Sequence, residues 1–337
     1  MYTLYNIYRR AIAVAVALTV MLFCSCSKKQ WHTYEGAVWG TTFHITYLSE
    51  ANMDDSINAV MRMVELSLSP FDKQSVVSRI NRGETVECDS LFIAVFERGK
   101  EVWSLSGGAF DPTVAPAVNL WGFGYKNLGR EPFDSEIDSV RELVGFGKAC
   151  MNDGMLLSPH GMEYDFSAIT KGFGCDMVGR MLARNGSIDY MVEIGGEIAL
   201  SGKNRMGEDW HIMVDAPVES NTEIVHDKMA VIAVTGCGIA TSGNYRNYRE
   251  TEKGKIWHTI DPRTCRPAEN VTISATVIAP DAMTADALAT ACMVMHPDSA
   301  IAMIDRLEGV RALLVVRSQG AESEWNTIAS GDFPERR

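Results

Sequence analysis

The order of predicted strands and helices constrains the fold of this 337-residue chain more than any other feature. Glycine-rich or polar turns separate four short strands, which the sequence predicts at 190–194, 197–201, 210–214 and 229–234. Consecutive strands with no helix between them pair as antiparallel hairpins, because a parallel pair needs a long crossover connection. The pattern therefore favours an α+β fold with largely antiparallel sheets and flanking helices.

Helices are predicted on both sides of this run of strands. Alternation and β-branched and aromatic residues predict one more strand at 39–47. Apolar residues at helical spacing and stop signals predict helices at 52–68, 91–105, 135–144, 171–185 and 281–295, and a final helix and strand within 299–316. No predicted strand leads into a glycine-rich dinucleotide motif, so a doubly wound nucleotide-binding fold is not expected.

The first 26 residues have the character of a secretion signal. Two arginines precede an apolar run at 11–23. The run is too short for a membrane-spanning helix, which needs about 20 apolar residues. It ends in two cysteines, of which Cys26 is the better candidate for lipid attachment because the small Ser25 precedes it. A plain cleaved signal or an uncleaved anchor is the alternative.

These features predict a division of the chain into three parts. We expect a signal peptide at 1–26, a tether at 27–37 and one enzyme domain at 38–330. The protein is then exported and lipid-anchored on the periplasmic side of a membrane, for which we expect the inner membrane.

The composition is typical of a globular protein, and the net charge argues against nucleic acid as a partner. Hydrophobic residues make up 46% of the chain and charged residues 22%, which is typical of a globular protein with a sizeable core. The net charge of −12, with no basic stripe, argues against nucleic acid. A nucleotide ligand would need its phosphate charge neutralised locally, most simply by a metal ion.

One predicted helix carries two oxygen-bearing side chains on the same face. Asp286 and Thr290 are four residues apart in the alanine-rich stretch 280–291. The small alanines leave room for a ligand, and a carboxylate beside a hydroxyl suits a hard cation such as Mg²⁺. The alternative is structural: Asp281 caps the helix and Asp286 is only solvated.

A second stretch, 165–174, runs from the end of a strand into the start of a helix. Exposed backbone N–H groups at a helix start, together with the ammonium group of Lys171, can bind an anion at this point. Capping of the helix by Asp165 or Ser167 would explain the same residues without any ligand.

Two pairs of glycines mark further loops. In the stretch 107–114 the glycines let the backbone approach a flat ligand, and Asp111 can accept hydrogen bonds. An Asp-Pro turn is the structural alternative. The stretch 193–197 has a Gly-Gly pair between two glutamates, which predicts a hairpin turn.

A fifth stretch, 257–264, contains a candidate proton acceptor. His258 precedes an Asp-Pro turn, and the pKa of an unperturbed imidazole lies near neutrality. A hydrogen-bonded structural histidine is the alternative.

Taken in this order, the five stretches resemble the ApbE family, the FAD:protein FMN transferases. The resemblance extends from residue 39 to about residue 316. It implies a single α+β unit related to T-fold proteins. It also implies transfer of FMN from FAD to a threonine or serine hydroxyl of a target protein, with release of AMP and with Mg²⁺ as cofactor.

The resemblance also implies roles for particular residues. FAD contacts fall on Trp39, Phe71, Ala109, Phe110, Asp111, Asp165, Lys171 and Ile260. Metal ligands fall on Asp286 and Thr290, and on the carbonyl groups of Ala168 and Ala289. Trp39 and Phe71 replace the methionine and tyrosine that are common in the family, and both rings can stack on a flavin.

Partners and alternative functions follow from the same resemblance. It implies acceptor proteins such as subunits of the Na⁺-translocating NADH:quinone reductase or related redox-driven ion pumps. His258 is our candidate for the catalytic base, because phosphoryl transfer to a hydroxyl needs a group that takes its proton. The alternatives are a Mg²⁺-dependent FAD pyrophosphatase, in which water replaces the protein hydroxyl, and a non-catalytic flavin-binding lipoprotein. A carrier has no need for Asp286 and Thr290 on one face, which argues against the last.

Overall fold

The structure is a computed structural model that describes residues 28–124, 130–217, 228–244, 248–251, 254–269, 271–318 and 325–335. The predicted signal peptide and its Cys26 lie outside these residues. Within the described ranges, none of the helices has the length and apolar character needed to span a membrane.

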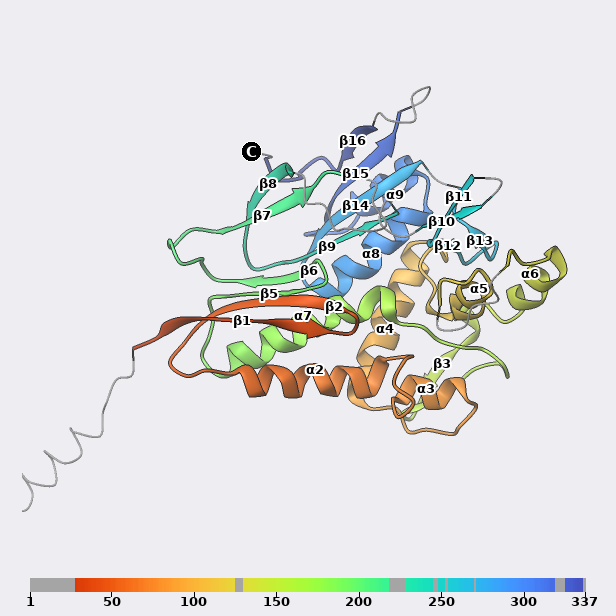
Figure 1. The fold of residues 1–337 in the computed structure, drawn as a ribbon, viewed down its shortest axis with the longest axis horizontal. Coiled ribbons are helices and arrows are strands. Elements are labelled where there is room, and N and C mark those ends of the chain that lie inside the picture. The colour runs from red at the N-terminus through yellow and green to blue at the C-terminus, as the bar shows by residue number, and fades with distance from the viewer. Residues whose placement is uncertain are drawn as a thin grey trace, which may run out of the picture.

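An antiparallel sheet of eight strands forms the centre of the molecule (Figure 1). Its order is β1 (Gln30–Val38), β2 (Thr41–Ser49), β5 (Tyr190–Ile194), β6 (Glu197–Ser201), β9 (Gly238–Gly243), β14 (Thr272–Ala279), β15 (Arg311–Arg317) and β16 (Trp325–Ala329). Each strand is antiparallel to its neighbours. The predicted α+β class and antiparallel pairing are confirmed.

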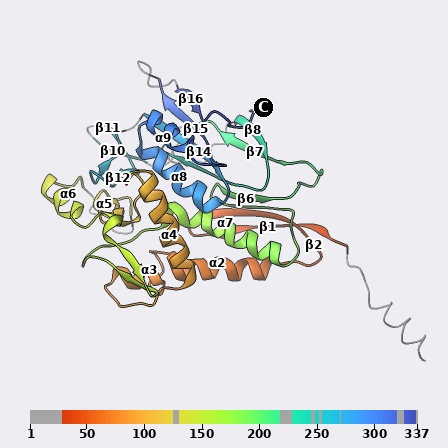
Figure 2. The same ribbon diagram turned by 180° about the vertical axis from the view of Figure 1, so that it is seen from behind.

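Helices cover one face of this sheet, as the view from behind shows (Figure 2). The helices α7 (Ser167–Arg184) and α8 (Ala282–Val294) contact the strands directly. The helices α2 (Asp54–Leu68) and α4 (Ser90–Leu105) pack on these two from outside, and α9 (Pro297–Ile304) contacts α8 and β15. The helices predicted at 52–68, 91–105, 171–185 and 281–295 are confirmed as α2, α4, α7 and α8, with small shifts at their ends.

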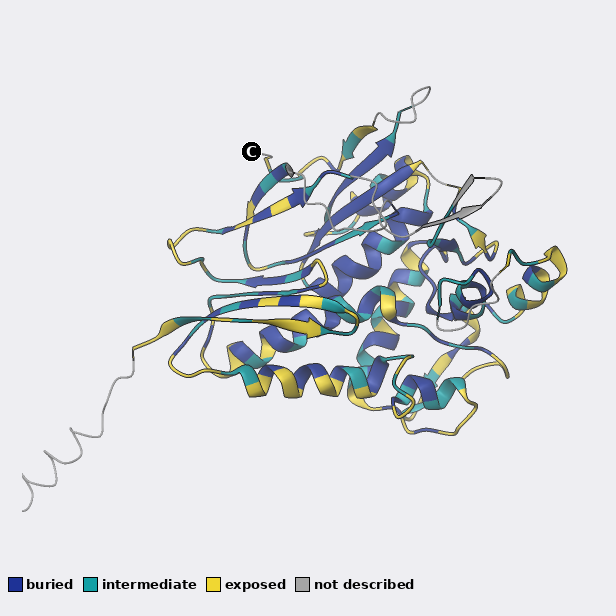
Figure 3. Ribbon diagram, in the orientation of Figure 1, coloured by how far each residue is buried: buried dark blue, intermediate teal, exposed yellow. Residues whose placement is uncertain are grey.

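A two-stranded ribbon covers part of the opposite face. It consists of β7 (Trp210–Asp215) and β8 (Lys228–Val234), and its apolar side chains pack on residues of β6, β9, β14 and β15. Because helix α8 covers one face of β14 and this ribbon the other, all eight residues of β14 are buried (Figure 3).

Shorter elements gather on the right of Figure 1, away from the first residues of β1. They are α3 (Val76–Asn81), η1 (Pro112–Val114), α5 (Ala115–Leu120), α6 (Asp134–Arg141), η2 (Phe146–Lys148), β3 (Cys150–Asn152), β4 (Met155–Leu157), β10 (Tyr248–Thr251), β11 (Gly254–Trp257), β12 (Ile260–Asp261) and β13 (Arg266–Pro267). A small apolar cluster that includes Trp121, Ile260 and Cys265 joins α5, α6 and the β12–β13 hairpin. The helix expected at 135–144 corresponds to α6.

The N-terminal segment differs from the prediction. Residues 30–37, expected to belong to a tether, form β1 and pair with β2 from Gln30–Ser49 to Val38–Thr41. Rings reinforce the pairing, since His32 stacks on Tyr47 with 5.1 Å between ring centroids. Trp39 and Gly40 form the turn of this hairpin, so the strand predicted from residue 39 begins at Thr41.

Candidate active site

The site is organised by an unusually close approach of helices α7 and α8. A Cβ atom placed on Gly172 would lie 2.1 Å from the Ala282 carbonyl oxygen and 2.9 Å from the Asp286 Cβ. Asp176 of α7 accepts hydrogen bonds from the backbone N–H groups of Ala282 and Met283, each at 2.9 Å. These N–H groups lie in the first turn of α8 and have no acceptor within the helix. The carboxylate of Asp176 therefore fixes where α8 begins.

This packing places the Asp286 side chain beside the first turns of α7. The Asp286 side chain is only 2% exposed, and its Oδ2 accepts a hydrogen bond of 3.0 Å from the Gly172 N–H. In a regular helix the Gly172 N–H would pair with the carbonyl of Ala168. The Gly172 N–H is shared with or given to Asp286, and the Ala168 carbonyl has two lone pairs, so it can take a further partner.

Replacing Gly172 with alanine should destabilise the protein. The added methyl group would overlap backbone atoms of α8, and overpacking of this kind costs about 1–3 kcal/mol or more in the free energy of unfolding. Gly331→Ala is the control, since a Cβ there meets no atom within 4 Å. Urea unfolding of both variants measures the difference. An unfolding free energy of Gly172→Ala equal to that of the control would contradict the close packing.

Three charged side chains meet where helices α7 and α8 pack together. The Lys171 Nζ lies 2.9 Å from Glu197 Oε1 and 3.9 Å from Asp286 Oδ1. The Glu197 side chain is 5% exposed and that of Lys171 is 30% exposed, so the cluster reaches solvent through the lysine. Burial raises the pKa of both Glu197 and Asp286, while the two carboxylates raise the pKa of Lys171 despite its own burial. Two acids with one base in a buried place favour one further positive charge, a proton or a metal ion.

The donors around Asp286 fit a hard cation. Thr290 lies one turn further along α8, and its Oγ1 is 3.4 Å from Ser242 Oγ on β9. With the carbonyls of Ala168 and Ala289 these donors are all oxygens, the ligand type that Mg²⁺ prefers while it keeps several waters. No group of three or more His, Cys, Asp or Glu side chains in the described ranges is arranged to hold a metal. A metal ion here would therefore rest on one carboxylate, a hydroxyl group and carbonyl groups.

Two segments from distant parts of the sequence are hydrogen-bonded to the residues just before α7. The Asp165 N–H donates to the Pro112 carbonyl at 2.8 Å, which joins α7 to the loop after α4. The Asn81 side chain makes two hydrogen bonds of 2.8 Å to the backbone of Tyr164, which joins α3 to the same segment. The Asp165 carboxylate accepts from the Ser167 N–H at 2.8 Å, although Phe166 rather than Asp165 is the N-cap residue of α7.

The ring of Trp39 packs against α7 at Gly174, which lies about one helical turn after Lys171. Trp39 adopts a left-handed backbone conformation, with φ of 51°. A Cβ on Gly174 would lie 2.5 Å from its ring, so the glycine makes space for the indole. The ring is half-buried, and its Nε1–H has no hydrogen-bond partner among the described residues. The ring of Trp39 therefore lies beside the part of α7 that follows Lys171.

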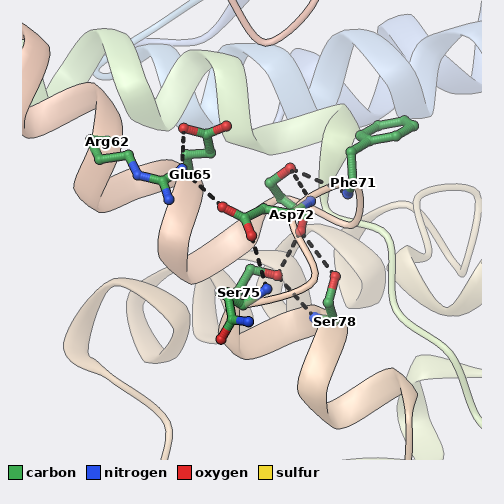
Figure 4. Close-up of polar contacts among 8 residues, drawn as sticks. Arg62, Glu65, Phe71, Asp72, Ser75 and Ser78 are labelled. Atoms are coloured by element: carbon green, nitrogen blue, oxygen red, sulfur yellow. Dashed lines mark hydrogen bonds and ion pairs between the residues drawn. The ribbon is translucent and has the colours of Figure 1, made fainter.

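Phe71 lies on the loop between α2 and α3, and an ion pair and hydrogen bonds stabilise this loop (Figure 4). The Phe71 side chain is 71% exposed. Arg62 of α2 binds Asp72 at 2.8 Å, and the Ser75 hydroxyl donates to the Ser69 carbonyl at 2.6 Å. The backbone N–H of residue 74 and the Arg62 guanidinium lower the pKa of Asp72. The loop can present an aromatic ring for stacking.

The loop after α4 differs from the expectation for its side chains. Phe110 is 2% exposed and belongs to the main core. Asp111 is buried and accepts hydrogen bonds from the N–H groups of Thr113, at 2.8 Å, and Phe146, at 2.9 Å. Burial raises the pKa of Asp111. Ala109 is buried as well. A ligand contact from this stretch would therefore come from its backbone rather than from these side chains.

The segment that carries His258 is hydrogen-bonded to the end of strand β9, and β9 also passes beside Thr290. The hydroxyl of the next residue, Thr259, donates to the Asn244 side chain at 2.6 Å. Asn244 directly follows β9. Ser242 of β9 lies beside Thr290. The His258 ring is half-buried and meets Phe123 edge to face, with 6.4 Å between centroids.

Ile260 does not have the exposure expected of a side chain that contacts FAD. It is buried in the small apolar cluster with Trp121 and Cys265. The hairpin that carries it nevertheless reaches the loop after α4, because a Cβ on Gly108 would lie 3.9 Å from Arg263 Cγ.

Comparison with known proteins gives the family and the relatives that this chain resembles. The family model described as "ApbE family" matches residues 39–314. The chain is 33% identical to the FAD:protein FMN transferase of Haemophilus influenzae, covering 91% of this chain and 92% of that protein. It is 34% identical to the FAD:protein FMN transferase of Vibrio cholerae, covering 95% and 97%.

Solved structures of flavin transferases also superpose on this chain. The flavin transferase ApbE from Vibrio cholerae superposes with a TM-score of 0.79 at 32% identity, covering 90% of this chain and 98% of that one. The apo flavinyl transferase ApbE of Pseudomonas stutzeri superposes with a TM-score of 0.79 at 28% identity, covering 90% and 96%.

Proposed function

The chain belongs to the ApbE family, and we propose that it is an FAD:protein FMN transferase that uses Mg²⁺, modifies a threonine or serine hydroxyl and releases AMP. The observation that carries the proposal is the convergence at one place of Trp39, the start of α7, the loop after α4 and Asp286 of α8. Aromatic surfaces suit the flat rings of FAD, a helix start suits its pyrophosphate, and a place for a cation suits transfer at that pyrophosphate.

The reaction exchanges the phosphoanhydride bond of FAD for a phosphoester bond to the acceptor protein. The oxygen of the acceptor hydroxyl bonds to the flavin-side phosphorus of FAD, and the pyrophosphate bond to that phosphorus breaks. The bonding electrons leave with AMP, and the hydroxyl proton passes to a base. His258 is the residue proposed to take this proton, because a neutral imidazole is a competent acceptor near neutral pH.

The protein contributes chiefly position and electrostatics, as phosphoryl transfer requires. The backbone at the start of α7 and the Lys171 ammonium would face the pyrophosphate. Asp286, Thr290 and the carbonyl of Ala168 would hold Mg²⁺, which when bound supplies charge neutralisation. Trp39 and Phe71 offer ring faces to the flat parts of FAD.

An assay of AMP tests the proposal against the pyrophosphatase alternative. The protein is incubated with FAD and Mg²⁺, with and without an acceptor such as a subunit of a redox-driven ion pump. A transferase is expected to release AMP in step with acceptor modification and little AMP without acceptor. Equal AMP release in both cases, with free FMN, would identify hydrolysis. No AMP release in either case would instead point to a flavin-binding lipoprotein without catalysis.

We also propose that the protein is exported and anchored by a lipid on Cys26, facing the periplasm. The support is the arginine pair, the apolar run and the small residue before Cys26. Cys26→Ala is expected to move the protein from the membrane fraction to the soluble fraction, with unchanged specific activity of the purified enzyme. Retention of the variant in washed membranes would indicate an uncleaved helix or another attachment.

A further inference from the structure

Glu197 is a buried acid that the proposed reaction does not use. It is the first residue of β6, directly after the turn at Gly195 and Gly196, and its side chain points between α7 and the sheet toward Lys171. Both glycines have positive φ, 65° and 98°. Gly195 also lets the lysine pass, because a Cβ on it would lie 3.3 Å from Lys171 Cδ. The hairpin is thus shaped to bring one carboxylate to this lysine.

The carboxylate of Glu197 is not satisfied by its own contacts. Its Oε1 binds Lys171, but its Oε2 is buried and has no hydrogen-bond partner among the described residues. An unpartnered buried carboxylate oxygen lowers stability, because it loses its hydration. A glutamine or an apolar residue would be less costly at a purely structural position.

Lys171 has two carboxylates within reach and lies nearer to Glu197. The distances from its Nζ are 2.9 Å to Glu197 and 3.9 Å to Asp286. With the lysine charge matched by Glu197, Asp286 retains the negative charge that attracts a cation. Without Glu197, a movement of about 1 Å by the flexible lysine chain would pair it with Asp286. A metal ion would then have to displace the ammonium.

We propose that Glu197 is a positioning residue that holds the Lys171 ammonium away from Asp286 and so keeps Asp286 available to the metal ion. The inference rests on the metal site of the proposed function. It concerns binding rather than turnover, so it is measurable without FAD or an acceptor.

The test is a titration of the purified metal-free protein with Mg²⁺, followed by calorimetry. Glu197→Gln is expected to weaken Mg²⁺ binding by about 10–100-fold, the usual effect of removing a partner that orients a metal ligand. Glu197→Asp, which keeps the charge, should recover part of the loss. Glu193→Gln is the matched control, because this acid of the same hairpin binds His44 at 2.9 Å instead of the lysine. It should leave Mg²⁺ affinity unchanged.

A double variant separates positioning from direct ligation. Lys171→Met removes the competing ammonium, so adding Glu197→Gln to it should cost no further Mg²⁺ affinity. A second loss as large as that of Glu197→Gln alone would overturn the proposal and make Glu197 a metal ligand. Unchanged Mg²⁺ binding by Glu197→Gln would also overturn it.

Two further outcomes are distinguishable. A melting temperature lowered equally with and without Mg²⁺, at normal metal affinity, would assign Glu197 a structural role and overturn the proposal. Failure of the wild-type protein to bind Mg²⁺ would remove the metal site itself and this inference with it. FMN transfer by the same wild-type sample would then show that the transferase function survives.

Discussion

Asp286→Ala is expected to lower the rate of FMN transfer by at least about 10³-fold, because a hard-cation site that loses its carboxylate leaves the pyrophosphate charge uncompensated. The protein should remain folded. Removal of one of two buried carboxylates leaves the 2.9 Å pair between Lys171 and Glu197 with balanced charge. The lost acceptor of the Gly172 N–H costs about 1–3 kcal/mol. Asp286→Asn retains an oxygen for this N–H and separates the loss of charge from the loss of the hydrogen bond.

The control for Asp286 is Asp298→Ala on α9, whose side chain is exposed. AMP release measured across a Mg²⁺ titration compares the variants. Near-normal, Mg²⁺-dependent AMP release by Asp286→Ala would contradict the assignment of Asp286 as a metal ligand.

His258→Ala is expected to slow transfer by about 10²–10⁴-fold, the range for loss of general-base assistance, while FAD affinity changes little. A residual rate should remain, because positioning and electrostatic stabilisation do not depend on the imidazole. The neighbouring turn has its own bonds, since Arg263 pairs with Asp261 at 2.8 Å and Thr259 binds Asn244. We therefore expect the loop to keep its conformation.

FAD titration by fluorescence and a melting curve test the role of His258. His211→Ala is the control, because His211 is an exposed histidine of β7 in the ribbon on the opposite face of the sheet. Weakened FAD binding together with a lower melting temperature would refute the assignment as base and give His258 a structural role. Deprotonation would then fall to another group.

The sequence allowed the arrangement of strands and helices to be predicted where one face is buried and the other exposed. Helix α2 shows this, since Ile57, Val60, Met61 and Val64 face the core at helical spacing. The central strand β14 was missed, because burial on both faces removes the alternation on which such a prediction depends. The strand β1 was mistaken for a tether, because its turn has Trp39 at positive φ, where hairpin turns usually have Asn, Asp or Gly.

The candidate site was only partly predictable. The position of Asp286 and Thr290 on one helix could be predicted from their spacing, whereas the N-cap of α7 is Phe166 and neither Asp165 nor Ser167. The inward direction of Phe110 and Asp111 was not predictable, because it depends on η2 and α4 packing beside them. Glu197 was treated only as the end of a hairpin, since its partner Lys171 is 26 residues away in sequence.

The most direct test of the proposed transferase activity is the intact mass of an acceptor protein after incubation with this enzyme, FAD and Mg²⁺. We predict a mass increase equal to FMN less one water, located on a single threonine or serine. The increase should be absent when that residue is replaced by alanine. An acceptor of unchanged mass, while FAD is consumed to free FMN and AMP, would contradict transfer and establish hydrolysis instead.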